Sequence, residues 1–133
     1  MENEWISYIR DGDRYLKAAA EGARRRKSVF IPEILYNIVS MAIEKHIMGY
    51  LLFHNRMPDN HTLADLAEAV GAIESFDDEL IRRMVRMDRF QRICALSDYF
   101  RQQPSEDDVG EFLEIGQLVR NSVAELLPEI PDN

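Results

Sequence analysis

The chain has 133 residues, of which 46% are apolar, 30% charged and 9% aromatic, and its formal net charge is −8. This length is typical of a single domain, and the apolar share excludes a disordered tail. Six glycines and five prolines are too few for the many tight turns of an all-β sandwich. The acidic balance argues against a molecule built as a general polyanion binder.

Charge is distributed unevenly along the chain. Residues 104–133 hold one arginine and eight acidic side chains, whereas residues 1–27 and 76–103 each carry a small excess of basic ones. A phosphate-binding surface is therefore expected from residues 1–27 or 76–103. The acidic last block is expected to pack against the arginine-rich ones.

The N-terminal sequence and the cysteine count indicate the compartment of the protein and exclude several kinds of site. The first residues lack the basic and then apolar run of a signal peptide, and no stretch of eighteen apolar residues occurs. We therefore expect a soluble, cytoplasmic protein without a membrane anchor. The single cysteine, Cys94, excludes an internal disulfide framework and multi-cysteine metal sites, and its apolar surroundings predict a small core hydrophobe.

Helical periodicity runs through nearly every long segment. The pattern predicts one domain over residues 1–133, an all-α up-and-down bundle of four long helices and one short helix. The long helices are expected over about 3–24, about 32–55, from a cap at Asp77 or Asp78 to about 102, and from Ser105 to Pro128. The short helix is expected from Thr62 to Gly71, capped by Thr62 with Asp65, and a second capping box joins Ser105 with Asp108.

The predicted helix over about 32–55 is apolar around most of its circumference. Such a helix must be covered on more than one side. We expect it to be the central helix of the bundle, a dimer interface, or both.

The three histidines, His46, His54 and His61, do not form a metal-binding pattern. Carboxylate-bridged metal bundles need Glu-x-x-His pairs, in which one helical turn aims both ligands at the metal, and none occurs. We interpret the histidines as polar-face or capping residues and expect no metal and no cofactor. Gly71 and Gly116 belong to no phosphate-binding loop, which excludes P-loop and Rossmann nucleotide sites.

Arginines form the clearest candidate ligand surface. Arg82, Arg86 and Arg89 fall within about 60° of each other around one predicted helix and form a stripe that could follow phosphates. The alternative is a solvated face that pairs with the acidic last helix, where each pair contributes under about 1 kcal/mol. The cluster Arg24–Lys27 has a simpler interpretation, neutralising a helix C-terminus.

Short motifs in a fixed order resemble the HEPN family (higher eukaryotes and prokaryotes nucleotide-binding). The resemblance spans about residues 30–127, with Thr62 standing where the family has an aspartate. The motifs are Tyr36-x-Ile38, Ala42-Ile43-Glu44-Lys45, Met48, Leu51-Leu52, Pro58, His61-x-Leu63-x-x-Leu66 and Leu96-Ser97-Asp98-Tyr99-Phe100-Arg101 before Pro104.

The resemblance implies a compact helical bundle that forms a homodimer. Many HEPN proteins pair with a small nucleotidyltransferase in two-component or toxin–antitoxin systems. Catalytic members are metal-independent ribonucleases with an Arg-x(4–6)-His motif near the end of the domain. There, the histidine would move the proton of the 2′-hydroxyl and the arginine would stabilise the phosphorane.

This chain departs from that motif. Arg120 and Asn121 match its start, but Glu125 occupies the place of the histidine, and no histidine follows His61. Arg56 precedes His61 at the right spacing, yet in the wrong segment. We therefore expect the last helix to present an arginine with no imidazole beside it, and we interpret the ribonuclease site as absent.

The leading hypothesis is a non-catalytic, dimeric HEPN-like bundle that binds a partner protein such as a small nucleotidyltransferase, a nucleotide or RNA. The alternative is a metal-independent ribonuclease with an altered site, Arg120 with Glu125 or Arg56 with His61. The expected ligand-binding residues are Arg120, Asn121, His61, Arg82, Arg86 and Arg89.

Overall fold

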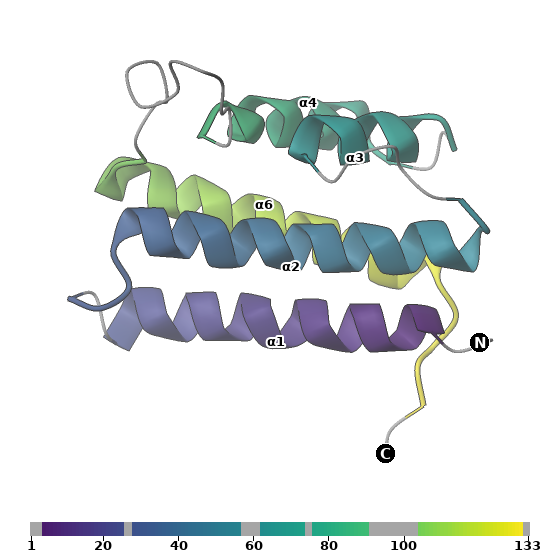
Figure 1. The fold of residues 1–133 in the computed structure, drawn as a ribbon, viewed down its shortest axis with the longest axis horizontal. Coiled ribbons are helices and arrows are strands. Elements are labelled where there is room, and N and C mark those ends of the chain that lie inside the picture. The colour runs from purple at the N-terminus through teal and green to yellow at the C-terminus, as the bar shows by residue number, and fades with distance from the viewer. Residues whose placement is uncertain (1–3, 26–27, 57–61, 74–75, 91–103, 132–133) are drawn as a thin grey trace.

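A computed structural model describes residues 4–25, 28–56, 62–73, 76–90 and 104–131 (Figure 1). Five α-helices and one 3₁₀ turn account for most of these residues, and no strand occurs among them. The elements are α1 (Glu4–Arg25), α2 (Pro32–Phe53), α3 (Leu63–Gly71), α4 (Asp78–Met87), η1 (Asp88–Phe90) and α6 (Glu106–Leu126). The predicted all-α bundle is therefore confirmed.

The helices stack in three layers, with α2 and α6 between α1 on one side and the α3–α4 pair on the other (Figure 1). In this view α1 and α4 run in one direction and α2 and α6 in the opposite one. Helix α2 contacts α1, α6 and α3, which confirms its predicted central position. No helix in the described part of the chain is both long and apolar enough to cross a membrane.

Three aromatic rings join α2, η1 and α6 in the core. Tyr36, Phe90 and Phe112, here called the aromatic trio, lie with ring centroids 5.2–5.3 Å apart in edge-to-face pairs. Each ring is at most 1% exposed. Edge-to-face geometry brings the positive rim of one ring to the negative face of the next, so the trio fixes how the three elements meet.

Two glycines let α1 and α2 approach closely. A β-carbon on Gly12 of α1 would lie 2.8 Å from the imidazole of His46, and one on Gly49 of α2 would lie 2.6 Å from the Ile9 side chain. Both distances are far below van der Waals contact. Only glycine therefore permits this close packing, which brings the His46 ring directly onto the backbone of α1.

The predicted helix caps are present. The Thr62 hydroxyl accepts from the backbone N–H of Asp65, the Asp77 carboxylate accepts from that of Leu80, and Asp108 accepts from the backbone N–H of Ser105. Helix α2 ends two residues before the predicted boundary. Asn55 adopts the left-handed conformation at φ 58°, which asparagine tolerates and which ends a helix by exposing its last carbonyls to new donors.

The predicted fourth helix is wrong over residues 88–90, where the chain tightens into the 3₁₀ turn η1 after Met87. Three interactions favour the break: Tyr36 donates to the carbonyl of Met87, Asp88 accepts from the backbone N–H of Leu63, and Phe90 enters the aromatic trio. Four long helices therefore become three among the described residues, with α4 short. The remainder of that predicted helix, including Cys94 and the HEPN-like segment 96–101, lies outside the described residues, as do Pro58 and His61.

Candidate functional site

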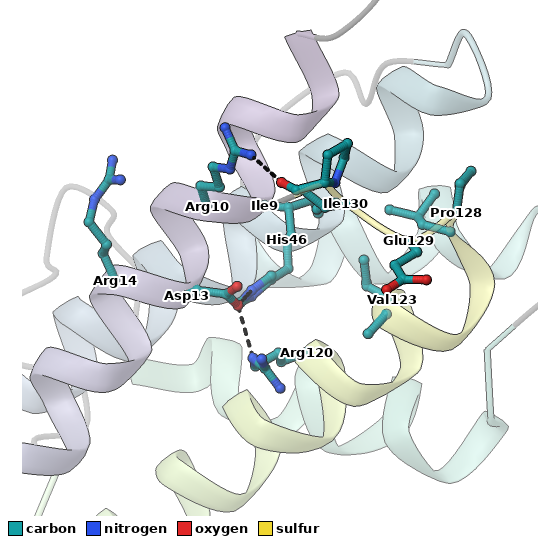
Figure 2. Close-up of a pocket in the computed structure, with 13 residues that line it drawn as sticks. Ile9, Arg10, Asp13, Arg14, His46, Arg120, Val123, Pro128, Glu129 and Ile130 are labelled. Carbon is teal, nitrogen blue, oxygen red and sulfur yellow. Dashed lines mark hydrogen bonds and ion pairs between the residues drawn. The ribbon is translucent and has the colours of Figure 1, made fainter. Parts of the chain in front are cut away.

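A groove of about 890 Å³ runs between α1, the last turns of α6 and the segment that follows α6 (Figure 2). One wall carries Arg10, Asp13 and Arg14 from α1, and the opposite wall carries Arg120 from α6. His46 of α2 lies at its base. Residues of three helices and of the C-terminal segment therefore meet in one hollow.

The centre of the groove is a cluster of three polar side chains, here called the polar trio: Asp13, His46 and Arg120. Oδ1 of Asp13 lies 2.9 Å from Nε2 of His46 and 2.9 Å from Nε of Arg120. Figure 2 shows the carboxylate between the imidazole and the guanidinium. One carboxylate oxygen therefore holds both nitrogen donors and joins α1, α2 and α6.

The three members differ sharply in exposure. The His46 side chain is 1% exposed, whereas those of Asp13 and Arg120 are 42% and 43% exposed. Burial lowers the pKa of His46, and the nearby Arg120 charge acts in the same direction, against the hydrogen bond and charge of Asp13. We therefore assign a neutral imidazole whose Nε2–H donates to the Asp13 carboxylate.

Two further arginines border the groove. Arg10 donates to the carbonyl of Pro131 at 2.9 Å and so ties the C-terminal segment to α1. Arg14 points away from the polar trio in Figure 2 and forms an ion pair with Asp11. With Glu129 on the far wall, the groove walls carry three arginines and two carboxylates.

This arrangement favours binding an anion over moving a proton. The bond from Nε to Asp13 fixes the plane of the Arg120 guanidinium, and its terminal amino groups are the donors that suit a phosphate or carboxylate. His46 cannot touch a ligand in the groove directly, because its Nε2 is occupied by Asp13 and its side chain is enclosed. Within the polar trio, Arg120 is therefore the side chain placed to contact an anion. Asp13 orients Arg120, and His46 holds Asp13.

Two sequence-based expectations about histidine are wrong. His46 does not lie on a polar face or at a helix cap; it is buried in the middle of α2. The last helix does not present its arginine without an imidazole nearby, because Asp13 links Arg120 to His46. Both errors have one cause: α1 supplies the carboxylate that makes a buried histidine tolerable.

The arginine stripe predicted on residues 82–89 lies on α4 and η1, away from this groove. Arg82 and Arg86 both contact Glu79 on their own helix, and the hydrogen bond from Arg82 lowers the pKa of the Glu79 carboxyl. The side chain of Arg89 lies outside the described part. On the same helix, Arg83 pairs with the acidic last helix by contacting Glu111 and Glu114.

The other candidates on the last helix do not join Arg120. Asn121 is exposed and accepts a hydrogen bond from Gln117, and it is not among the groove residues. Glu125 follows Arg120 by five residues, which places it about 140° away around the helix. The structure therefore does not assemble the predicted Arg120–Glu125 pair in the groove.

Only Arg56 of the second predicted ribonuclease pair, Arg56 with His61, lies among the described residues. Arg56 is exposed just beyond α2, and His61 lies outside the described residues. His54, also exposed, packs its ring edge-to-face against Tyr50 at 4.7 Å. Within the described ranges, no group of three histidine, cysteine, aspartate or glutamate side chains is placed to hold a metal ion.

Asp13 and His46 are the site residues that sequence reasoning missed. The available signal was the position of His46 within a helix that is apolar on nearly every side, which predicts a buried imidazole in need of a partner. The partner itself could not be found, because Asp13 lies 33 residues away and several acidic side chains compete for the role.

Comparison with protein-family models, curated proteins and solved structures finds no match to this chain. The HEPN resemblance therefore rests on the sequence motifs alone.

Proposed function

We propose that this protein is a non-catalytic, HEPN-like helical bundle that binds a phosphate-bearing ligand, a nucleotide or RNA, in the groove between α1 and α6. The observation that carries the proposal is the anchored guanidinium of Arg120, held through Nε by Asp13 at 2.9 Å. A guanidinium fixed in advance loses less conformational freedom when a ligand binds. Arg10 and Arg14 on the same groove add positive charge.

The buried state of His46 supports binding rather than catalysis. A general base must come within hydrogen-bond reach of the proton that it takes, and Nε2 of His46 reaches only as far as Asp13. This replaces the earlier expectation that no imidazole would lie near Arg120. An imidazole does lie near Arg120, but its enclosure at 1% exposure keeps it from acting on a ligand in the groove.

The proposal is tested by replacing Arg120. We expect Arg120→Gln to weaken the binding of ribose 5-phosphate at least about tenfold, because a charge-assisted hydrogen bond to phosphate is lost. Arg82→Gln is the matched control, since it removes the same charge from an exposed arginine on α4. Isothermal titration calorimetry measures both variants, and equal affinity in all three proteins would contradict the proposal.

Incubation with RNA in EDTA separates this proposal from the ribonuclease alternative. We expect no cleavage by the purified protein. Cleavage that disappears in Arg120→Gln or His46→Gln, and persists in Arg82→Gln, would show that the polar trio performs chemistry and would overturn the non-catalytic part.

The homodimer part of the proposal rests on apolar side chains that the single chain leaves uncovered on α2. Ile34 is 39% exposed and Met41, two turns later on the same face, is 40% exposed. Sedimentation at micromolar concentration tests it, and a monomer would remove this part while leaving the groove untouched. A nucleotidyltransferase partner remains a proposal that the HEPN resemblance alone suggests.

A further inference from the structure

The turn between α1 and α2 directs two aliphatic side chains into solvent. Val29 is 50% exposed and Ile31 is 46% exposed. Between them, Phe30 turns inward: it is half-buried, packs against the core, and occupies the space that a β-carbon on Gly22 of α1 would need. Because this contact anchors the turn on α1, Phe30 holds its two neighbours in their exposed positions.

Two arginines without an ion-pair partner lie beside this turn. Arg24 and Arg25 are exposed in the last turn of α1, and neither forms an ion pair or a side-chain hydrogen bond within the described part of the chain. The helix dipole favours basic residues at this position, but it leaves their side-chain donors unused. Arginines elsewhere are held by a carboxylate or a backbone carbonyl, namely Arg10, Arg14, Arg82, Arg83, Arg86 and Arg120.

We propose that the α1–α2 turn binds the surface of an anionic lipid bilayer. Arg24 and Arg25 contact the lipid headgroups, while Val29 and Ile31 enter the boundary between the headgroups and the acyl chains. These four residues are here called the basic–apolar patch. None of them borders the groove between α1 and α6, so this inference does not depend on the proposed function.

The composition of the basic–apolar patch favours a bilayer over a nucleic acid or a protein. Nucleic-acid sites combine basic groups with aromatic rings on which bases stack, whereas the exposed side chains here are aliphatic and Phe30 faces inward. Protein partners need a complementary shape, whereas a fluid bilayer accepts a turn at the tip of a bundle (Figure 1). Peripheral membrane binding combines apolar insertion with attraction between basic residues and anionic lipids, and the turn supplies both.

The charge of the rest of the molecule restricts how it can approach such a bilayer. The net charge of −8 repels an anionic surface, so the contact must be confined to a basic patch. The carboxylates that oppose it at this end are Glu21 and Glu33 on α1 and α2 and Glu106, Asp107 and Asp108 in the first turn of α6 (Figure 1). The contact is therefore expected to be reversible and sensitive to salt.

The first test is cosedimentation of the full chain with vesicles of two compositions. One contains phosphatidylcholine and phosphatidylserine in equal amounts, and the other contains phosphatidylcholine alone. We expect binding to the mixed vesicles only, and weaker binding as the salt concentration rises, because salt screens the arginine contacts. Equal binding to both compositions, or no binding to the mixed vesicles, would overturn the proposal.

The second test removes the two halves of the basic–apolar patch separately. Arg24→Gln with Arg25→Gln is expected to weaken partitioning into the mixed vesicles by about fivefold for each arginine. Val29→Ser with Ile31→Ser is expected to weaken it by about tenfold, because two aliphatic side chains no longer enter the bilayer. All four positions are exposed, so both variants should remain folded, which thermal unfolding checks.

Helix α4 supplies matched controls for both halves. Arg82→Gln with Arg86→Gln removes the same charge from two exposed arginines that are paired with Glu79. Val85→Ser removes an aliphatic side chain that is 46% exposed. We expect these variants to bind the mixed vesicles as the wild type does. If they lose binding while the patch variants keep it, the assignment to the α1–α2 turn is overturned.

Two further measurements separate the lipid from other partners and this inference from the proposed function. If Arg24→Gln with Arg25→Gln weakens binding of polyglutamate or single-stranded RNA, and Val29→Ser with Ile31→Ser leaves vesicle binding unchanged, the patch is a site for a soluble polyanion and the proposal fails. Arg120→Gln should bind the mixed vesicles as the wild type does, whatever its affinity for ribose 5-phosphate. Vesicle binding lost in Arg120→Gln and kept in the patch variants would move the lipid contact to the groove and overturn this inference.

Discussion

The aromatic trio and the polar trio both join α2 to α6, the first through buried rings and the second through partly exposed polar side chains. Each has one member on α2 and one on α6, and each adds a third from another element: η1 for Phe90 and α1 for Asp13. The aromatic rings are enclosed on every side, whereas two of the three polar side chains are over 40% exposed. Burial of the aromatic rings stabilises the contact between α2, η1 and α6, whereas the polar trio leaves hydrogen-bonding groups exposed at the surface.

The largest expected effect is at the aromatic trio. Phe112→Ala removes a ring that is 1% exposed and should lower the free energy of unfolding by about 3–5 kcal/mol. Leu118→Ala, at an exposed apolar position of the same helix, is the control and should change it little. Arg120→Gln in the polar trio should lower it by under about 1 kcal/mol. Urea denaturation measures all three, and comparable losses at Phe112 and Arg120 would show that the polar trio stabilises the fold as much as the aromatic trio does.

An intermediate effect on stability is expected at Gly12 of α1, whose backbone lies against the His46 ring of the polar trio. A β-carbon there would meet the His46 ring at 2.8 Å, so Gly12→Ala should destabilise the protein by about 1–3 kcal/mol and displace the imidazole. Gly110→Ala is the matched control. It places a methyl group in open space on helix α6 and should raise the free energy of unfolding by about 0.5–1 kcal/mol. Thermal unfolding distinguishes the opposite signs.

The smallest expected effect is the pH dependence that His46 contributes. Because burial lowers its folded-state pKa below the ordinary value of 6.5, the unfolded chain binds a proton before the folded chain does. The wild type should therefore lose stability as the pH falls from 6.5 through the folded-state pKa, by at most about 1.4 kcal/mol per pH unit. His46→Gln should lack this loss, whereas His54→Gln, at an exposed histidine, should retain it. Parallel curves for wild type and His46→Gln would contradict the buried, neutral imidazole.

Local signals in the sequence predicted much of the fold. The caps at Thr62, Asp77 and Ser105 were recognisable because a capping side chain and its backbone partner lie three residues apart. The central position of α2 followed from its apolar circumference. The end of α4 at Met87 could not be predicted in the same way, because it depends on Tyr36 and Leu63, partners from other helices.

The site was harder to predict for the same reason. Arg120 was singled out through the HEPN resemblance and does lie in the groove. Its partners, Asp13 and His46, come from two other helices, and helical periodicity gives the face of a residue but not which residue faces it across an interface. The motif paired Arg120 with Glu125, but a separation of five residues places the two side chains on different faces of the helix. Arg120 contacts Asp13.

Two prolines, Pro128 and Pro131, enclose Glu129 and Ile130 in the segment that borders the groove. Pro128 and Pro131 each lock one backbone dihedral angle, while Ile130 packs against the core and Arg10 holds the carbonyl of Pro131. The segment 128–131 is therefore already held in place before the proposed ligand binds. A segment held in this way loses less conformational entropy when the proposed ligand binds. The affinity of the groove should therefore depend mainly on how well the ligand fits it and little on rearrangement of the segment.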